Sequence, residues 1–256
     1  MATRLSGVVI RASDVKSLSE FWTKVLGEDV VDGANGLALR FVEAQGAKQG
    51  KNRVHLDLKG GPEQLARLLE LGAVRADIGQ GDVPWEVLAD PEGNEFCLQP
   101  PTPVDELDGD PAVGSGAVTA PRSGAAEHDD WYGRAVGIGV RWTAVCQDAA
   151  DPQAQSKFWT AAAGSGWHVV AEGDWGLAMR HAEDVRCPML VLGPPLADKS
   201  GPHRVYLRVT PNPGSHAAVE TSRLVIEGAR RADGLLLDPE DNEFGISGAT
   251  AHLNTL

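Results

Sequence analysis

The sequence has few cysteines, few basic residues and no long apolar run. Its 256 residues include three cysteines, Cys97, Cys146 and Cys187, and an odd, sparse set of this kind argues against a disulfide scaffold. No stretch has the length of a membrane span, and the N-terminal MATRLSGVVIRASD lacks the apolar core of a signal peptide. We therefore expect a cytoplasmic protein with reduced thiols and no membrane partner.

Basic residues are outnumbered by acidic ones, 23 against 36, and the formal net charge is −13. Nucleic acids and anionic membranes are bound through basic faces, so this charge argues against both as partners. The sequence also lacks a Walker loop, a dinucleotide fingerprint, a nucleophile elbow and a CxxC pair. What remains is a globular chain, 42% apolar, with enough apolar residues for a buried core in each half.

Three pairs of short motifs occur in the same order in the two halves of the chain. The pairs are FWTKVLG at 21–27 with KFWTAAAG at 157–164, GLALR at 36–40 with GLAMR at 176–180, and LADPEGNEFCL at 88–98 with LLDPEDNEFGI at 236–246. Three pairs in one order indicate an internal duplication.

Within each half the pattern predicts strands and helices in a repeated order. In the first half we expect strands at 5–12 and 52–58, helices at 13–27 and 61–73, a hairpin over 28–44, and two closing strands joined by the turn DPEGN. The second half repeats this order over 138–248 and adds a strand, CPMLVLG. The interval from Phe21 to His55 is 34 residues, and the corresponding interval from Phe158 to Tyr206 is 48.

The domain organisation follows from the repeat. We expect one domain at 1–100, a linker rich in Pro, Gly and Ala at 101–135, a second domain at 136–248 and a tail at 249–256. Residues 1–100 are expected to superpose on 138–248 as one fold.

These motifs resemble the vicinal oxygen chelate superfamily, in its glyoxalase-like and bleomycin-resistance-like branch. SDVKSLSEFWTKVLG is similar to the first strand–helix unit of that family, and NRVHLDL with DPEGNEFCL is similar to the second. The resemblance implies an α+β fold of tandem glyoxalase-like domains. Each domain would consist of two βαβββ modules that form a curled sheet around a concave pocket.

The resemblance also implies a divalent metal, such as Zn, Fe, Ni or Mn, held at four positions per site. In the first half these positions carry Gly7, Glu43 in an uncertain register, His55 and Cys97, and in the second half Ala144, an apolar residue of PMLVL, Tyr206 and Gly245. Open metal sites normally use three or four His, Cys or carboxylate ligands. We therefore expect no metal and no other cofactor, and a metal, if bound, would use His55, Cys97 and Glu43.

Candidate site residues come from strands expected to line the pocket. His55 is the candidate catalytic residue, because imidazole exchanges protons near neutral pH. Glu95 and Cys97 share one face of a strand, because they alternate with Phe96. The candidate ligand-contacting residues are Arg40, Trp85, Glu95, Cys97, Trp142, Trp175, Arg180 and Tyr206. For the tryptophans the alternative is core packing, for the arginines surface placement, and for Cys97 a filler of small volume.

Three functions stay open at this stage. The leading hypothesis is a metal-independent protein that binds a small organic molecule for sequestration, resistance or sensing. The first alternative is a lyase, isomerase or dioxygenase that uses His55 as a base or a metal at an altered site. The second is an association module, in which the duplication forms a dimer-like pair inside a monomer, or the chain forms a homodimer.

Overall fold

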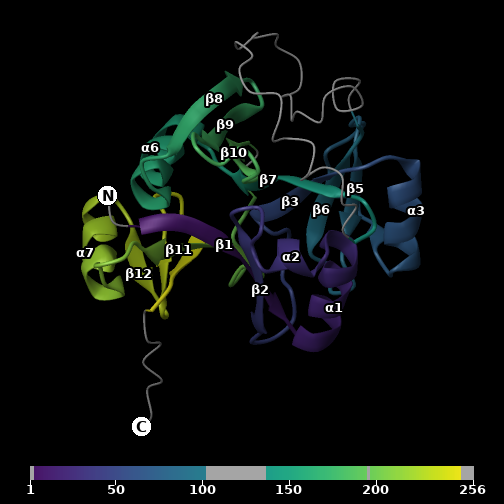
Figure 1. Cartoon of the computed structure of the whole chain (residues 1–256), viewed down its shortest axis with the longest axis horizontal. Helices are drawn as coiled ribbons and strands as arrows, with labels where there is room; N and C mark the ends of the chain where they lie inside the picture. The colour runs from purple at the N-terminus through teal and green to yellow at the C-terminus, as the bar shows by residue number, and fades with distance from the viewer. Residues whose placement is uncertain (1–2, 102–136, 195–196, 249–256) are drawn as a thin grey trace.

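The computed structural model describes residues 3–101, 137–194 and 197–248. The expected linker, apart from residue 101, and the expected tail lie outside these residues. The described chain forms two curled sheets with helices packed against them, an α+β fold as predicted (Figure 1). None of its helices combines the length and the apolar character needed to cross a membrane.

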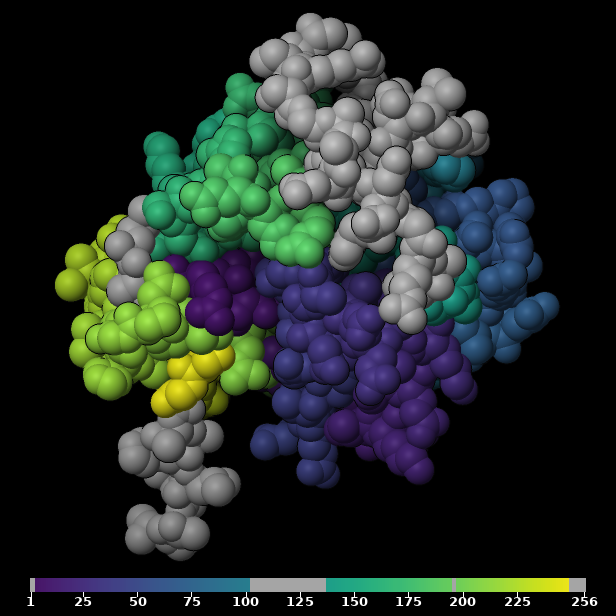
Figure 2. Space-filling model, in the orientation of Figure 1, coloured from purple at the N-terminus to yellow at the C-terminus, as the bar shows by residue number. Residues whose placement is uncertain are grey.

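The first sheet, called sheet A, joins the beginning of the chain to its end. Its strands are β1 Thr3–Ala12, β2 Ala38–Glu43, β11 Val205–Pro211, β12 Arg230–Ala232, β13 Leu235–Leu237 and β14 Glu243–Ile246. They lie in the order β12-β13-β14-β11-β1-β2, with β1 antiparallel to β11 and β2 at one edge. Figure 2 shows the purple N-terminal strand lying against the yellow-green C-terminal module.

The second sheet, called sheet B, is formed by the middle of the chain. Its strands are β3 Val54–Lys59, β4 Val74–Arg75, β5 Glu86–Ala89, β6 Glu95–Gln99, β7 Arg141–Asp148, β8 Trp167–Gly173, β9 Gly176–His181 and β10 Met189–Gly193. Their order is β4-β5-β6-β3-β7-β10-β9-β8, and the central pair β3–β7 is antiparallel. Sheet B therefore also takes strands from both halves of the sequence.

Strand pairing thus crosses the expected domain limits. The first quarter of the chain pairs with the last quarter in sheet A, and the two middle quarters pair in sheet B. Neither 1–100 nor 136–248 forms a sheet of its own, although both carry the repeated motifs. The physical reason is that each βαβ unit has an open strand edge, whose unpaired backbone N–H and C=O groups can pair with any similar edge. Alternation of apolar residues does not specify which edge is used.

Five helices of the described chain pack against the sheets. They are α1 Val15–Leu26, α2 Glu28–Val31, α3 Pro62–Glu70, α6 Pro152–Ala163 and α7 Ala217–Ile226. Asp14 caps α1, since its carboxylate accepts a hydrogen bond from the Ser17 backbone N–H at 3.0 Å. Gly27, with φ of 85°, ends the same helix.

The repeated FWT and NEF motifs pack against each other in the core. Trp22 of α1 meets Phe96 of β6 edge-on at 5.2 Å, and Trp159 of α6 meets Phe244 of β14 at 5.5 Å. All four rings are buried. The contact joins a helix of one module to a strand of the next, so one core extends across both sheets.

The expected hairpin over 28–44 is wrong. Glu28–Val31 is helical, and β2 runs parallel to β1. In the second half β10, the added strand CPMLVLG, takes the corresponding place beside β7. The interval from Phe21 to His55 is shorter than the one from Phe158 to Tyr206, which contains β8, β9 and β10. It has no room for three strands and contains only one, β2. As a result Arg40 on β2 and Arg180 on β9 do not occupy matching places, although GLALR and GLAMR are nearly identical.

Candidate ligand-binding site

Three polar side chains meet on the face of sheet B opposite to the helices. Strand β3 buries Val54, Leu56 and Leu58 in the core, so its alternate residues His55 and Asp57 point to the other face. Cys97 of the neighbouring strand β6 joins them there. One ligating atom from each of His55, Asp57 and Cys97 lies within 4.8 Å of the other two. We call these three residues the His55 cluster.

The His55 cluster is largely shielded from solvent. His55 Nε2 lies 3.5 Å from Asp57 Oδ1, and the two side chains are 13% and 15% exposed. Gln99 Nε2 donates a hydrogen bond to Asp57 Oδ2 at 3.4 Å. Asp57 Oδ1 is buried and, apart from its 3.5 Å contact with His55, has no hydrogen-bond partner in the described chain. A buried carboxylate oxygen without a hydrogen-bond partner is costly, so it is suited to bind a cation.

The thiols beside Asp57 are protonated at neutral pH. Burial, and then the negative charge of Asp57, raises the pKa of Cys97 and of Cys146 well above that of a free thiol. A nucleophilic cysteine needs the opposite, a pKa lowered by a nearby cation. Without such a cation the cluster therefore offers one acid–base pair, His55 and Asp57, and no activated nucleophile.

Apolar side chains flank the polar cluster across the strands. Because paired residues of adjacent strands share one face of a sheet, the strand register gives the neighbours directly. The row through Asp57 reads Val87, Cys97, Asp57, Ala144 and Met189. A few polar groups between apolar walls are typical of sites for small organic molecules.

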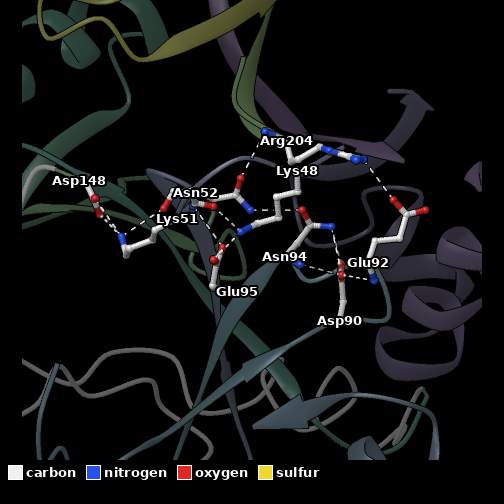
Figure 3. A network of polar contacts seen from close by, with 10 residues as sticks. Lys48, Lys51, Asn52, Asp90, Glu92, Asn94, Glu95, Asp148 and Arg204 are labelled. Carbon is white, nitrogen blue, oxygen red and sulfur yellow. Dashed lines mark hydrogen bonds and ion pairs between the residues drawn. The ribbon is translucent and has the colours of Figure 1, made fainter. Parts of the chain in front are cut away.

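Glu95, the first residue of β6, is held in a polar network two residues before Cys97 (Figure 3). Lys48 Nζ donates to Glu95 Oε1 at 2.6 Å, and the Asn52 backbone N–H donates to Oε2 at 3.2 Å. Lys51 binds Asp148 beside it at 2.8 Å. The carboxylate of Glu95 therefore fixes the loop before β3.

Sheet A has different side chains at the corresponding positions. Tyr206 on β11 is 8% exposed and lies under the guanidinium of Arg11, 4.8 Å from the ring centroid. Gly245 and Gly7 flank this strand without side chains. A Cβ at Gly7 would lie 2.2 Å from the Ala38 carbonyl oxygen, so the close approach of β1 and β2 requires glycine.

The remaining candidate residues are spread over the molecule. Trp85 precedes β5, and its buried indole N–H has no partner in the described part of the chain. Trp142 packs in the core, where it donates to the Ala144 carbonyl, and Trp175 is 46% exposed in a turn between β8 and β9. Neither is placed to clamp a ligand against the His55 cluster.

Two arginines and one glutamate complete the set. Arg180 on β9 contacts the sulfur of Met189 at 3.8 Å, at the far side of the row through Asp57. Arg40 on β2 pairs with Asp32 in sheet A. Glu43 also lies in sheet A, so it is not part of the His55 cluster.

Asp57 is the site residue that sequence reasoning missed. It stands two residues after His55, and strand alternation alone would have placed both on one face. Together His55, Asp57 and Cys97 fit a divalent metal better than the set expected from the sequence, which was His55, Cys97 and Glu43. His55, Asp57 and Cys97 would supply three ligands to zinc and leave an open position, because the paired Ala144 has no donor.

Two curled sheets built from βαβ modules, with a polar cluster on the sheet face opposite to the helices, are typical of vicinal oxygen chelate proteins. The chain belongs to the glyoxalase-like domain family, whose model matches residues 7–99 and again residues 144–247. The predicted resemblance is confirmed.

Comparison with solved structures agrees with this family. Glyoxalase I from Zea mays superposes with a TM-score of 0.54 over 98% of this chain and 94% of that one, at 14% identity. A candidate dioxygenase from Bacillus subtilis gives 0.50 over 96% and 86%, at 13% identity. At such identities the likeness shows the fold alone. No match was found among curated proteins.

Proposed function

We propose that the chain binds a small organic molecule on the concave face of sheet B without the metal that its family resemblance implies. His55 and Asp57 would hold the polar part of the ligand, and Val87, Ala144 and Met189 its apolar part. The ligand would be sequestered or sensed, as in a resistance protein.

The observation that carries this proposal is the meeting of His55, Asp57 and Cys97 between apolar walls. The paired position in sheet A has Tyr206 in place of His55, so the two sheets are not equivalent sites. Each sheet already pairs two modules from one chain, which supports a monomer with an internal pseudo-dimer.

A second candidate function is favoured by Asp57 Oδ1, which is buried and accepts no hydrogen bond within the described residues. A divalent ion bound by His55, Asp57 and Cys97 would satisfy that oxygen and would deprotonate the Cys97 thiol. It would supply a Lewis acid for lyase, isomerase or dioxygenase chemistry. His55, Asp57 and Cys97 would then be ligands, and the apolar walls would orient the substrate.

A fragment screen by ligand-observed NMR on metal-free protein tests the first candidate. We expect binders whose affinity falls about tenfold or more in His55→Ala, because a buried polar contact is lost. The matched control is Tyr206→Phe, which changes the corresponding strand position of sheet A and should leave affinity within about threefold. Equal sensitivity of the two variants, or the absence of binders, would contradict the proposal.

Elemental analysis separates the two candidates. Protein purified without added metal is expected to contain far less than one ion per chain and to keep its binders after treatment with a chelator. One tightly held zinc, iron, nickel or manganese per chain, lost in Asp57→Asn together with ligand binding, would establish the second candidate instead.

A further inference from the structure

The concave face of sheet A contains a cavity of about 400 Å³ that the proposed site on sheet B does not use. Its wall includes Gly7 of β1, which is paired with Arg208 of β11 on one side and with Ala38 of β2 on the other. Gly245 of β14 pairs with the far side of Arg208. The row across the sheet reads Gly245, Arg208, Gly7 and Ala38. One guanidinium therefore stands among residues with almost no side chain.

The corresponding row of sheet B has the opposite chemistry. The repeats RVHLDL at 53–58 and RVYLRV at 204–209 align Asp57 with Arg208. The pairings agree, because Asp57 lies between Cys97 and Ala144 as Arg208 lies between Gly245 and Gly7. One framework thus presents a carboxylate on sheet B and a guanidinium in a hollow on sheet A.

Hydroxyl groups fix the orientation of Arg208. Its Nε donates to Ser247 Oγ at 2.8 Å, and the Ser247 and Thr210 hydroxyls are 2.9 Å apart. Thr210 donates to Ser6 Oγ at 2.7 Å, and Ser6 donates to the Arg208 carbonyl at 3.1 Å. Because Thr210 and Ser6 use their protons in this way, Ser247 donates to Thr210, and no hydroxyl proton remains for a ligand.

The outer edge of the Arg208 guanidinium is left free by this arrangement. Its two Nη atoms have no hydrogen-bond or ion-pair partner within 3–101, 137–194 and 197–248. A guanidinium held at Nε presents a planar pair of N–H groups, which is the geometry that binds two oxygens of a carboxylate or phosphate.

The cavity is cationic in a strongly acidic protein. Arg4 and Arg40 line it together with Arg208, and Asp32 is the acidic residue among its lining residues. Asp32 pairs with Arg40 at 3.2 Å, so Arg4 and Arg208 have no acidic partner among the described residues that line the cavity. Against a net charge of −13 for the chain, this local excess of positive charge attracts anions to one place.

We propose that this cavity is a second binding site, which takes the carboxylate or phosphate group of a small anionic molecule. Arg208 would bind the oxoanion directly from the floor of the hollow, Arg4 and Arg40 would add charge at its edge, and Ser247 would be a positioning residue. This site does not use His55, so its test is independent of the proposed function of sheet B.

Calorimetric titration of the full chain with inorganic phosphate and with succinate tests this proposal and separates the two oxoanions. We expect saturable binding of at least one probe, weakened by added sodium chloride because salt screens charge. Arg208→Gln should lower the affinity about tenfold or more. Ser247→Ala, which keeps the guanidinium but removes its anchor, should lower it by a smaller factor.

Two control variants make the test specific. Arg75→Gln removes the same charge from an exposed arginine of sheet B and should leave the affinity within about twofold. His55→Ala should also leave it unchanged. If Arg208→Gln does not fold, as judged by circular dichroism, the half-exposed Arg40→Gln takes its place, with an expected loss of about threefold or more. Absence of saturable binding, or an equal loss in Arg75→Gln, would overturn the proposal.

Discussion

At the residue scale, the repeated strands RVHLDL and RVYLRV differ at the side chains that face the concave sides. His55 and Asp57 of the first strand are replaced by Tyr206 and Arg208 of the second. The core-facing Leu56 and Leu207 are the same and fully enclosed. Duplication therefore kept the packing face, where a change in volume is costly, and changed the open face, where chemistry can vary.

A buried histidine makes stability dependent on pH. His203, just before β11, is 6% exposed, and burial lowers its pKa to about 4, against the opposing effect of Glu243. Lys199, Arg53 and Arg11 also surround it and lower the pKa further. The unfolded chain takes up this proton below about pH 6.5, whereas the folded chain resists it until about pH 4.

We therefore expect the free energy of unfolding to fall as pH decreases from about 6.5 to about 4, by up to about 3 kcal/mol from this group. Urea titrations at several pH values measure it. His203→Phe should flatten this part of the profile, whereas the exposed His168→Asn should leave its slope unchanged. An unaltered slope in His203→Phe would show that other groups cause the dependence.

At the scale of elements, helix starts and the repeated turns are connected by side chains. Glu92 in the turn DPEGN accepts hydrogen bonds from the backbone N–H groups of Ser13 and Asp14, both at 2.7 Å. Glu240 does the same for Ala150 and Asp151 in the second half. A carboxylate beside a helix start satisfies free N–H groups and interacts favourably with the helix dipole. This contact gives the Glu of Asp-Pro-Glu the same role in both copies.

Two glycines of sheet A are expected to respond differently to the same substitution. Gly7→Ala places a Cβ 2.2 Å from the Ala38 carbonyl oxygen, so β1 and β2 must separate. Gly245→Ala brings its Cβ to 3.4 Å from Tyr206, an ordinary contact. Thermal and urea unfolding should show a loss of about 1–3 kcal/mol for Gly7→Ala and less than about 1 kcal/mol for Gly245→Ala. Equal losses would mean that the strand spacing adapts freely.

At the scale of the whole molecule, the two halves of the sequence depend on each other. The antiparallel pairs β1–β11 and β3–β7 each join one half to the other. Removing either half would expose strand edges and buried apolar residues of both sheets.

Fragments 1–101 and 137–248, expressed separately, are therefore expected to be unfolded or self-associated. When mixed they should form a folded 1:1 complex. Circular dichroism combined with size-exclusion chromatography measures both states, with the intact chain as reference. A monomeric, folded 1–101 would contradict the strand pairing described for sheets A and B.

Much of the local structure was predictable from the sequence. The strand at β1, the helix predicted over 13–27 and the added strand CPMLVLG follow from residue periods and terminators. The grouping of His55 with Cys97 followed from family positions. Each of these depends on neighbours in sequence or on motifs within one half.

Only the tertiary structure decided how the modules pair and what their open faces contain. The sequence by itself determined the duplication and the alternation that buries Leu56 and Phe96. It did not determine that β1 pairs with β11, because open strand edges of similar composition are interchangeable in sequence. That choice places Gly7 beside Arg208, and hence a cationic hollow on one sheet and the His55 cluster on the other, since side chains meet according to strand register and not according to their distance along the chain.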